Sequence, residues 1–251
     1  MNNVDPFFSA AALHFQNLFD RYDAPIIILN LVKSKEKTRR EAILLEEFTE
    51  CVSYLNQFLP DSRKMTYIPY DMAKASKSHD HDVVKTPQDI GEQAIQKTSF
   101  FCLGSTLQKG IVRTNCIDCL DRTNAAQMII GKVAFAHQLH TMGIISEPNI
   151  AFDTEAINLL NTIYHDLGDT IALQYGGSNL VNTMETYRKI SAWSSHSRDM
   201  LESLKRYYSN SFTDAEKQDA FNLFLGMFRV DPDKQHIWDL DTDFYLHVKF
   251  Y

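Results

Sequence analysis

The chain has 251 residues, of which 44% are hydrophobic and 23% are charged, so it can bury a large core and is too apolar to be disordered. Its formal net charge of -7 argues against a general nucleic-acid binder, which needs a basic face. The four cysteines are too few and too unevenly spaced for a disulfide-stapled secreted domain, and we expect free thiols in a reducing compartment.

The first half of the chain alternates between helical and strand patterns. Residues 8–20 place apolar side chains at helical spacing, and residues 25–32 (PIIILNLV) are short, apolar and β-branched, as in a buried strand. We predict an amphipathic helix over 35–59, a second strand over 65–71 and an exposed polar loop over 73–88. No apolar run is long enough to cross a membrane, and the start MNNVDPFF does not resemble a secretory signal. We therefore expect a cytoplasmic protein, or one on the cytosolic face of a membrane.

The alternation continues into the middle of the chain and then gives way to helices. We predict a helix over 89–101, a third strand over 110–115 and a long helix over 123–142 with Gly143 as its C-cap. Three strands among helices predict an α/β fold with a mixed, partly parallel sheet flanked by helices. The C-terminal half reads as largely helical, with helices predicted over 154–174, 179–190, 197–208 and 214–228.

The segment 113–124 (RTNCIDCLDRTN) lies between the third predicted strand and the next helix, and it contains Cys116, five further residues, Arg122 and Thr123. A loop of this length can wrap around a phosphate with its N–H groups pointing inward, at the positive end of the following helix dipole. The same field is expected to lower the pKa of the Cys116 thiol and to supply a thiolate nucleophile. Arg122 would hydrogen-bond two phosphoryl oxygens. The spacing predicts a cysteine-dependent phosphatase, with loop amides from Ile117, Cys119 and Leu120 contacting the phosphate.

The expected reaction forms a cysteinyl-phosphate, and an acid must protonate the leaving oxygen. Asp118 and Asp121 are the nearest candidates, of which we favour Asp118, and Thr123 can hydrogen-bond the sulfur in the second step. Asp121 has a structural alternative, in which it accepts backbone N–H bonds or pairs with an arginine such as Arg113. An acid from a distant segment is a third option, with the candidates Asp71 and Asp169.

Cys116 and Cys119 also satisfy the Cys-x-x-Cys spacing of a redox dithiol or of half a zinc site. A zinc site needs a second pair, and Cys51 and Cys102 stand alone without close His or Cys partners. We therefore predict no metal site. The mechanism needs no cofactor, although Mg2+ that arrives with a polyphosphate substrate can act as an activator.

The segment 113–124 resembles the catalytic loop of the Sac-domain phosphoinositide phosphatases. Similar family blocks cover most of the chain: residues 25–33, 67–77, 124–139 and 164–178. Three further segments resemble the branch that acts on phosphatidylinositol 3,5-bisphosphate, namely 186–200, 204–228 and 238–247. The resemblance implies removal of the 5-phosphate on endosomal and vacuolar (lysosomal) membranes, by a peripheral enzyme in complex with a scaffold protein and the phosphatidylinositol 3-phosphate 5-kinase.

The resemblance also implies the domain organisation. Residues 1–228 would form the C-terminal part of a Sac catalytic domain, and residues 229–251 an irregular C-terminal arm. A complete family member would carry a mostly β subdomain and an earlier part of the catalytic domain ahead of Met1. We therefore expect a fragment, whose sheet lacks strands.

An inositol polyphosphate needs cations beyond Arg122. Lys74 and Lys77 are candidate contacts to a second phosphate, and solvated surface lysines are the alternative. Lys33, at the end of the first strand, is a weaker candidate. His79 and His81 lack a third ligand, and we assign them no role.

Two features of the second half have structural alternatives. Asp169 and residues 174–177 (QYGG) can let the backbone approach the catalytic loop, and helix capping by the glycines explains them equally well. Trp193 and Trp238 read as core residues. Two other functions stay open: an assembly component of a lipid kinase and phosphatase complex with little activity of its own, and a protein tyrosine phosphatase.

Overall fold

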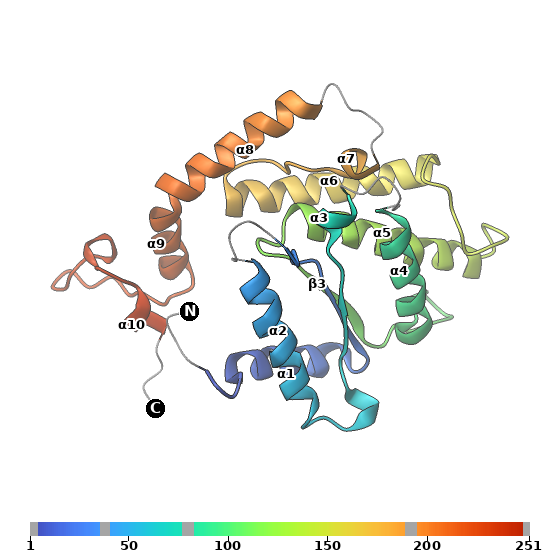
Figure 1. Cartoon of the computed structure of the whole chain (residues 1–251), viewed down its shortest axis with the longest axis horizontal. Coiled ribbons are helices and arrows are strands. Elements are labelled where there is room, and N and C mark those ends of the chain that lie inside the picture. Colours follow the sequence, from blue (N-terminus) through green and yellow to red (C-terminus); the bar gives the residue numbers. More distant parts are fainter. Residues whose placement is uncertain (1–4, 36–40, 77–82, 189–194, 248–251) are drawn as a thin grey trace.

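The computed structural model describes residues 5–35, 41–76, 83–188 and 195–247. Its centre is a three-stranded sheet of β1 (Ile26–Asn30), β2 (Thr66–Pro69) and β3 (Ile111–Asn115), in the order β2-β1-β3. Both pairings are parallel. The α/β class expected from the sequence is confirmed, and helices cover the sheet on both faces (Figure 1).

The order of the strands decides which helix covers which face. The chain passes from β1 through α2 (Glu41–Asn56) to β2 on one side, and then through α4 (Lys85–Thr98) to β3 on the other side of β1. Right-handed crossovers that run in opposite directions along a sheet place their helices on opposite faces. Accordingly, α1 (Ser9–Tyr22) joins α2 on one face, and α5 (Asp121–Thr141) joins α4 on the other.

The central strand β1 is buried along its whole length, as its unbroken apolar run predicts. Because alternate side chains of a strand point to opposite faces, Ile26 and Ile28 pack against α1 and α2, whereas Leu29 packs against α5. The contacts on the first face come from Phe15, Phe19 and Val52, and those on the second from Ala126, Met128 and Ile129. This double burial fixes β1 as the core of the molecule.

A second layer of helices lies on α5. The long helix α6 (Glu155–Gly176) starts at Thr154, whose hydroxyl accepts the Ile157 N–H, and it packs along α5. The two helices approach closely at Gly168, where a Cβ atom would lie 2.6 Å from Nδ2 of Asn124. Beyond α6 come α7 (Met184–Arg188), α8 (Ser195–Phe212) and α9 (Asp214–Phe224), so the helical second half is confirmed.

Some predicted boundaries were wrong. The segment predicted as a polar loop contains most of α3 (Met72–Ala75), buried Val83 and Val84, and the first turn of α4. The two valines pack into the core, and the polar composition of the segment as a whole gave no sign of this. Trp238 is 68% exposed and is not a core residue, while Trp193 lies outside the described residues. The remaining short helices are a 3-10 turn at Asp61–Arg63, another at Ile237–Asp239, and α10 (Phe244–His247).

The C-terminal segment after residue 228 contains only these last two short helices in its described part, and the boundary placed there remains a prediction. In the part of the chain that the structure describes, no helix is long and apolar enough to cross a membrane.

Gly110→Ala is expected to destabilise the fold much more than Gly143→Ala. Both residues have positive φ angles, of 73° and 74°, which cost an L-residue about 1 kcal/mol. A Cβ at Gly110 would also lie 2.0 Å from the Pro25 carbonyl oxygen, whereas nothing lies within 4 Å of one at Gly143. Urea unfolding should show losses of about 3–5 and about 1 kcal/mol, respectively. Equal losses would contradict the tight junction between β3 and the entry to β1.

Candidate active site

The segment between β3 and α5 forms the predicted loop, at the carboxyl ends of the central strands. Asn115, the last residue of β3, lies in register with Asn30, and its side-chain amide donates to the Asn30 Oδ1 at 2.8 Å. The backbone N–H of Leu31 donates to the Asn115 carbonyl at 2.7 Å. In open parallel sheets, ligands bind at this edge where the chain order reverses around the first strand. The loop therefore occupies the usual position for a site.

Three groups of the loop converge on the Cys116 sulfur. The backbone N–H of Cys119 donates to Sγ at 3.1 Å, and the Thr123 hydroxyl donates to it at 3.4 Å. The thiol itself donates to Oδ1 of Asp118 at 3.2 Å. Cys119 has a left-handed φ of 55°, which turns its N–H inward, as in backbone nests that bind anions. The sulfur thus has a hydrogen-bond donor on two sides and a proton acceptor on a third.

The pKa values of the two loop cysteines differ from the expectation that the Cys116 thiol has the lowered one. The hydrogen bond with Cys116 lowers the pKa of Cys119 to about 6. The same interaction, burial and the Asp118 carboxylate together raise the pKa of Cys116, although Thr123 and Arg122 oppose them. The predicted lowering at Cys116 is therefore wrong for this loop geometry, because the helix dipole competes with a carboxylate and a second thiol in direct contact.

Arg122 is held from behind by two groups that sequence analysis missed. Its Nη1 donates to the Leu31 carbonyl and to Oε2 of Glu41, both at 2.8 Å, and its Nη2 donates to Oε1 of Glu41 at 3.3 Å. Among the described residues, these bonds leave the Nε hydrogen and one Nη2 hydrogen for a phosphate. The side chains of Arg122 and Glu41 are only 11% and 6% exposed, so this fork is fixed before any ligand arrives.

Glu41 also organises the end of β1. It accepts the Lys33 backbone N–H at 3.0 Å and forms an ion pair with the Lys33 Nζ at 3.1 Å. Burial opposes ionisation of Glu41, but the hydrogen bonds from Arg122 and Lys33 outweigh it and lower its pKa. Lys33, a weak candidate from sequence, thus shares Glu41 as a partner with Arg122.

Asp121 lies at the first position of α5 and is engaged in structural contacts. Its carboxylate accepts the Val181 N–H at 3.1 Å and two bonds from Arg206 on α8, at 3.2 and 3.4 Å. Burial raises the pKa of Asp121, against the opposing charge of Arg206. The predicted partner was wrong, because Arg113 instead donates to Asn115 and lies over the Phe48 ring. The pinning role is correct, with an arginine from 85 residues further along the chain.

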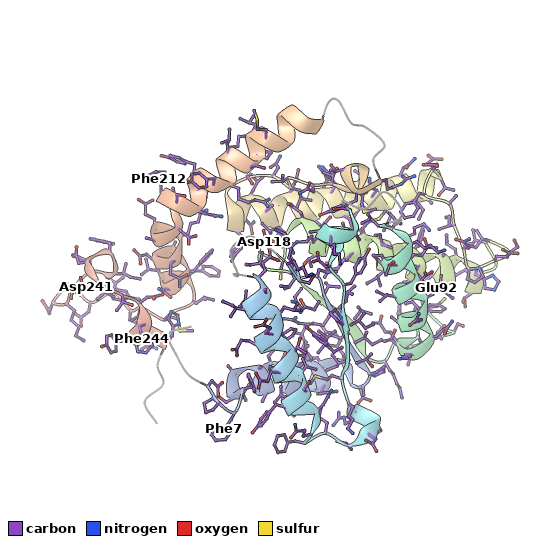
Figure 2. All side chains as sticks on the ribbon, in the orientation of Figure 1. Phe7, Glu92, Asp118, Phe212, Asp241 and Phe244 are labelled. Carbon is purple, nitrogen blue, oxygen red and sulfur yellow. The ribbon has the colours of Figure 1, made fainter. Side chains whose placement is uncertain are left out.

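Asp118 is the more accessible of the two loop carboxylates. Besides the Cys116 thiol, its Oδ1 accepts the Leu120 N–H at 3.2 Å, while Oδ2 faces Nη1 of Arg206 at 3.8 Å. The side chain is 35% exposed, compared with 13% for Asp121. Figure 2 shows Asp118 near the centre of the molecule, below the end of α6. Asp118 is therefore placed to exchange a proton with both the sulfur and a bound ligand.

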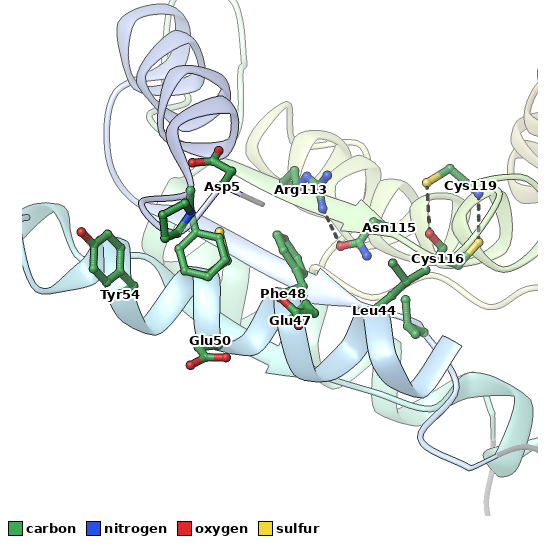
Figure 3. A pocket seen from close by; sticks show the side chains of 14 residues that line it. Asp5, Leu44, Glu47, Phe48, Glu50, Tyr54, Arg113, Asn115, Cys116 and Cys119 are labelled. Carbon is green, nitrogen blue, oxygen red and sulfur yellow. Dashed lines mark hydrogen bonds between the residues drawn. The ribbon is translucent and has the colours of Figure 1, made fainter. Parts of the chain in front are cut away.

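A pocket of about 810 Å³ opens beside the two loop cysteines, between α2, β3 and the start of the described chain (Figure 3). Its walls are mainly apolar and include Leu44, Phe48 and Tyr54. Among the described residues, its lining contains three carboxylates, from Asp5, Glu47 and Glu50, and one basic side chain, that of Arg113. These three carboxylates would repel a polyphosphate in that part of the pocket.

The other predicted site residues differ in exposure, and some lie outside the described residues. Ile117 is exposed in the loop, whereas Leu120 is buried against Ala172 and Leu180, so its side chain packs and only its backbone can contact a phosphate. Lys74 is exposed on α3, and Lys77, His79 and His81 lie outside the described residues. Both distant acids are engaged elsewhere in structural contacts: Asp71 with Ser34 and the start of α3, and Asp169 with the Leu180 N–H.

The glycine-rich end of α6 serves both of its predicted purposes. Gly177 ends the helix in a left-handed conformation with φ 68°, and its N–H donates to the Leu173 carbonyl. Gly176 lies against the loop, because a Cβ there would come within 3.2 Å of Leu120 and 3.4 Å of Arg206. Close packing of α6 therefore supports the loop from outside.

In the described part of the chain, no group of three or more His, Cys, Asp or Glu side chains could hold a metal ion. The four cysteines are free thiols.

Comparison with known proteins identifies the family of this chain. A family model described as the SacI homology domain matches residues 2–77, which include β1, α2 and β2. A polyphosphoinositide phosphatase of Schizosaccharomyces pombe is 53% identical over 231 residues, which cover 90% of this chain and 28% of the relative. This chain belongs to the Sac-domain family. Two Sac-domain proteins of Arabidopsis thaliana, phosphatidylinositol-3-phosphatase SAC1 and phosphoinositide phosphatase SAC2, are 33% and 36% identical and match 99% and 95% of the chain.

The Sac-domain sequence in this chain spans about a third of the length of these relatives, from 28% to 37%. What these relatives do is therefore carried over to this chain only as a proposal.

We expect Glu41→Gln to lower the free energy of unfolding at pH 7 by about 1.5–3 kcal/mol, since a buried charge-assisted fork is lost. Because the folded-state pKa of Glu41 is lowered from 4.5, this contribution is present above pH 4.5 and is lost as the pH falls through the folded-state value. The difference between variant and wild type should therefore shrink in urea unfolding at pH 4. Glu47→Gln, exposed on the same helix, is the control. An equal difference at both pH values would contradict the ionised fork.

Proposed function

We propose that this chain carries a phosphoinositide phosphatase that removes the 5-phosphate of phosphatidylinositol 3,5-bisphosphate through a cysteinyl-phosphate. The observation that carries the proposal is the convergence of the Cys119 N–H, the Thr123 hydroxyl and the Asp118 carboxylate on the sulfur of Cys116, at the start of α5. A nucleophile with two hydrogen-bond donors and a proton acceptor around it meets the requirements of covalent phosphoryl transfer.

In the first step, the Cys116 proton moves to Asp118, whose oxygen lies 3.2 Å away. The thiolate attacks phosphorus, the ester bond breaks, and Asp118 returns that proton to the leaving inositol oxygen. The Nε and remaining Nη2 hydrogens of Arg122, the loop amides and the positive end of α5 stabilise the charge that gathers on the phosphoryl oxygens. Proton and charge balance without a cofactor.

In the second step, water attacks the cysteinyl-phosphate and gives a proton to Asp118, while sulfur leaves as a thiolate. The Thr123 hydroxyl, 3.4 Å from the sulfur, and the Cys119 N–H stabilise that thiolate. Inorganic phosphate then departs, and the proton returns from Asp118 to Cys116. Mg2+ is not needed for either step, but it can act as an activator by binding the substrate's phosphates.

The choice of substrate is supported by the resemblance of residues 186–200, 204–228 and 238–247 to one branch of the family, and by the 53% identity to a polyphosphoinositide phosphatase. The same resemblance supports a peripheral position on endosomal and vacuolar membranes. It also supports assembly with a scaffold protein and the phosphatidylinositol 3-phosphate 5-kinase. Lys33, held beside Arg122 through Glu41, is one lysine that could meet a second phosphate, with Lys74 and Lys77 as further candidates.

An assembly role is the second candidate function. The observation that favours it is the apolar outer face of α8 and α9, where exposed side chains include Tyr207, Phe212 and Phe224. Faces of this kind mark interaction sites on soluble proteins. The two functions are separable, because Cys116→Ser should leave complex assembly intact while it removes catalysis.

Cys116→Ser should abolish phosphate release in a panel of phosphoinositide headgroups, assayed with this chain and with a full-length relative. Phosphatidylinositol 3,5-bisphosphate should be the preferred substrate of the wild type, and a phosphotyrosine peptide the poorest. The loop chemistry itself does not discriminate between alcohols, so this preference would come from contacts outside the loop. Cys102→Ser, away from the loop, is the control. Undiminished release from Cys116→Ser would overturn the mechanism, and a preference for the peptide would overturn the substrate.

Asp118→Asn should slow hydrolysis of the inositol lipid by about 10²–10³-fold, because a poor leaving group needs protonation. An activated aryl phosphate, whose leaving group needs no proton, should lose less than about tenfold. Asp121→Asn should mainly reduce stability, since it leaves Arg206 without its buried partner. Equal losses of Asp118→Asn on both substrates, measured as kcat, would exclude Asp118 as the acid.

A further inference from the structure

The helix α8 buries polar side chains and exposes large apolar ones. From residue 200 onward, all of its large apolar or aromatic side chains are 52–70% exposed: Met200, Leu201, Leu204, Tyr207, Tyr208 and Phe212. Glu202 and Ser209 are buried, and the Arg206 side chain is only 13% exposed. Figure 2 shows Phe212 on the outer side of the helix. Because an amphipathic helix normally buries its apolar stripe, specific polar contacts must hold α8 in place.

Arg206 makes most of those contacts, and all of them lie around the catalytic loop. Its Nε donates to the Ser178 hydroxyl at 3.1 Å, and its Nη2 donates to the Asn179 carbonyl at 3.0 Å. Its two Nη atoms form a fork with Asp121, and Nη1 also lies 3.8 Å from Oδ2 of Asp118. Every N–H of the guanidinium thus faces an acceptor, which is what a buried arginine requires.

These contacts fix the loop acid on one side. Asp118 turns Oδ1 toward the Cys116 thiol and Oδ2 toward Arg206, so the cation determines which oxygen reaches the sulfur. Arg206 also offsets the negative charge that two loop carboxylates place near the nucleophile. Other charged or titratable groups that face this cluster come from the loop, α2, α5, α7 and α8: Cys119, Glu41, Arg122, Tyr187 and Glu202.

We propose that Arg206 is a positioning residue of the phosphatase loop, which holds Asp118 in the orientation for proton transfer and compensates the loop carboxylates. The inference rests on the proposed function, and it adds to the site a residue of α8, a helix outside the sheet. A purely structural residue would act only through its pair with Asp121. A positioning residue acts on proton transfer through Asp118 as well.

A double-variant design separates the two roles. Arg206→Met leaves Asp121 buried and unpaired, so both stability and kcat should fall, the latter by about 10²-fold. Adding Asp121→Asn removes that buried charge and should restore most of the stability. If Arg206 positions Asp118, kcat of the double variant stays far below that of Asp121→Asn alone, while KM changes by less than about threefold. Arg206→Lys should recover part of kcat. Lys205→Met, exposed on the same helix, is the control.

Alkylation of Cys116 by iodoacetamide, followed by mass spectrometry, supplies a readout that needs no turnover. Loss of Arg206 leaves the Asp118 charge less compensated, so the pKa of Cys116 rises further and alkylation at pH 7 should slow by about tenfold. Lys205→Met should leave the rate unchanged. Restoration of both kcat and alkylation in the double variant would overturn the inference and leave Arg206 a structural residue.

The same set of proteins distinguishes failure of the inference from failure of the proposed function. If the wild type releases no Cys116-dependent phosphate from any phosphoinositide, the proposed function fails. The alkylation rates then still decide whether Arg206 governs the loop, because they report the charge at the sulfur directly. If the wild type is active and Arg206→Met matches its kcat, the inference fails and the proposed function stands.

Discussion

Parallel pairing between β1 and β3 carries the catalytic loop to its place. The bond from the Leu31 N–H to the Asn115 carbonyl extends this pairing one residue past β1, so that the Leu31 carbonyl reaches Arg122 directly. Because β1 is buried on both faces, neither strand end can shift without disturbing the core. The geometry at Cys116 is therefore set by the packing of the sheet as much as by the loop's own sequence.

Two ion pairs then hold the loop from opposite directions. Glu41, at the start of α2, forms an ion pair with Arg122, while Arg206 on α8 forms one with Asp121 and lies near Asp118. Both pairs are largely buried, so each is sensitive to the loss of one partner. The loop is consequently held between α2, which packs on the sheet, and α8 in the outer layer. These contacts keep its charges in fixed positions before a substrate binds.

Sequence patterns predicted the strands, most helices and the whole loop, because apolar periodicity and the spacing from Cys116 to Arg122 are local signals. They did not reveal Glu41 or Arg206, which lie 81 and 85 residues from their partners and look like ordinary polar residues of helices. Asn30 gave a hint of long-range polar contacts, since a polar residue inside a buried strand needs a partner. That partner is Asn115 on the neighbouring strand. The prediction that the pKa of Cys116 is lowered was wrong for a similar reason, because this pKa depends on where the Asp118 side chain points.

The left-handed backbone at Cys119 limits which sequences this loop can accept. With φ at 55°, β-branched residues would strain the turn, whereas glycine or asparagine would fit it. An asparagine there would keep the inward N–H and remove the thiol that competes with Cys116 for a single negative charge. Two versions of the same fold could thus differ in the reactivity of their nucleophile through one side chain that leaves the shape of the loop unchanged.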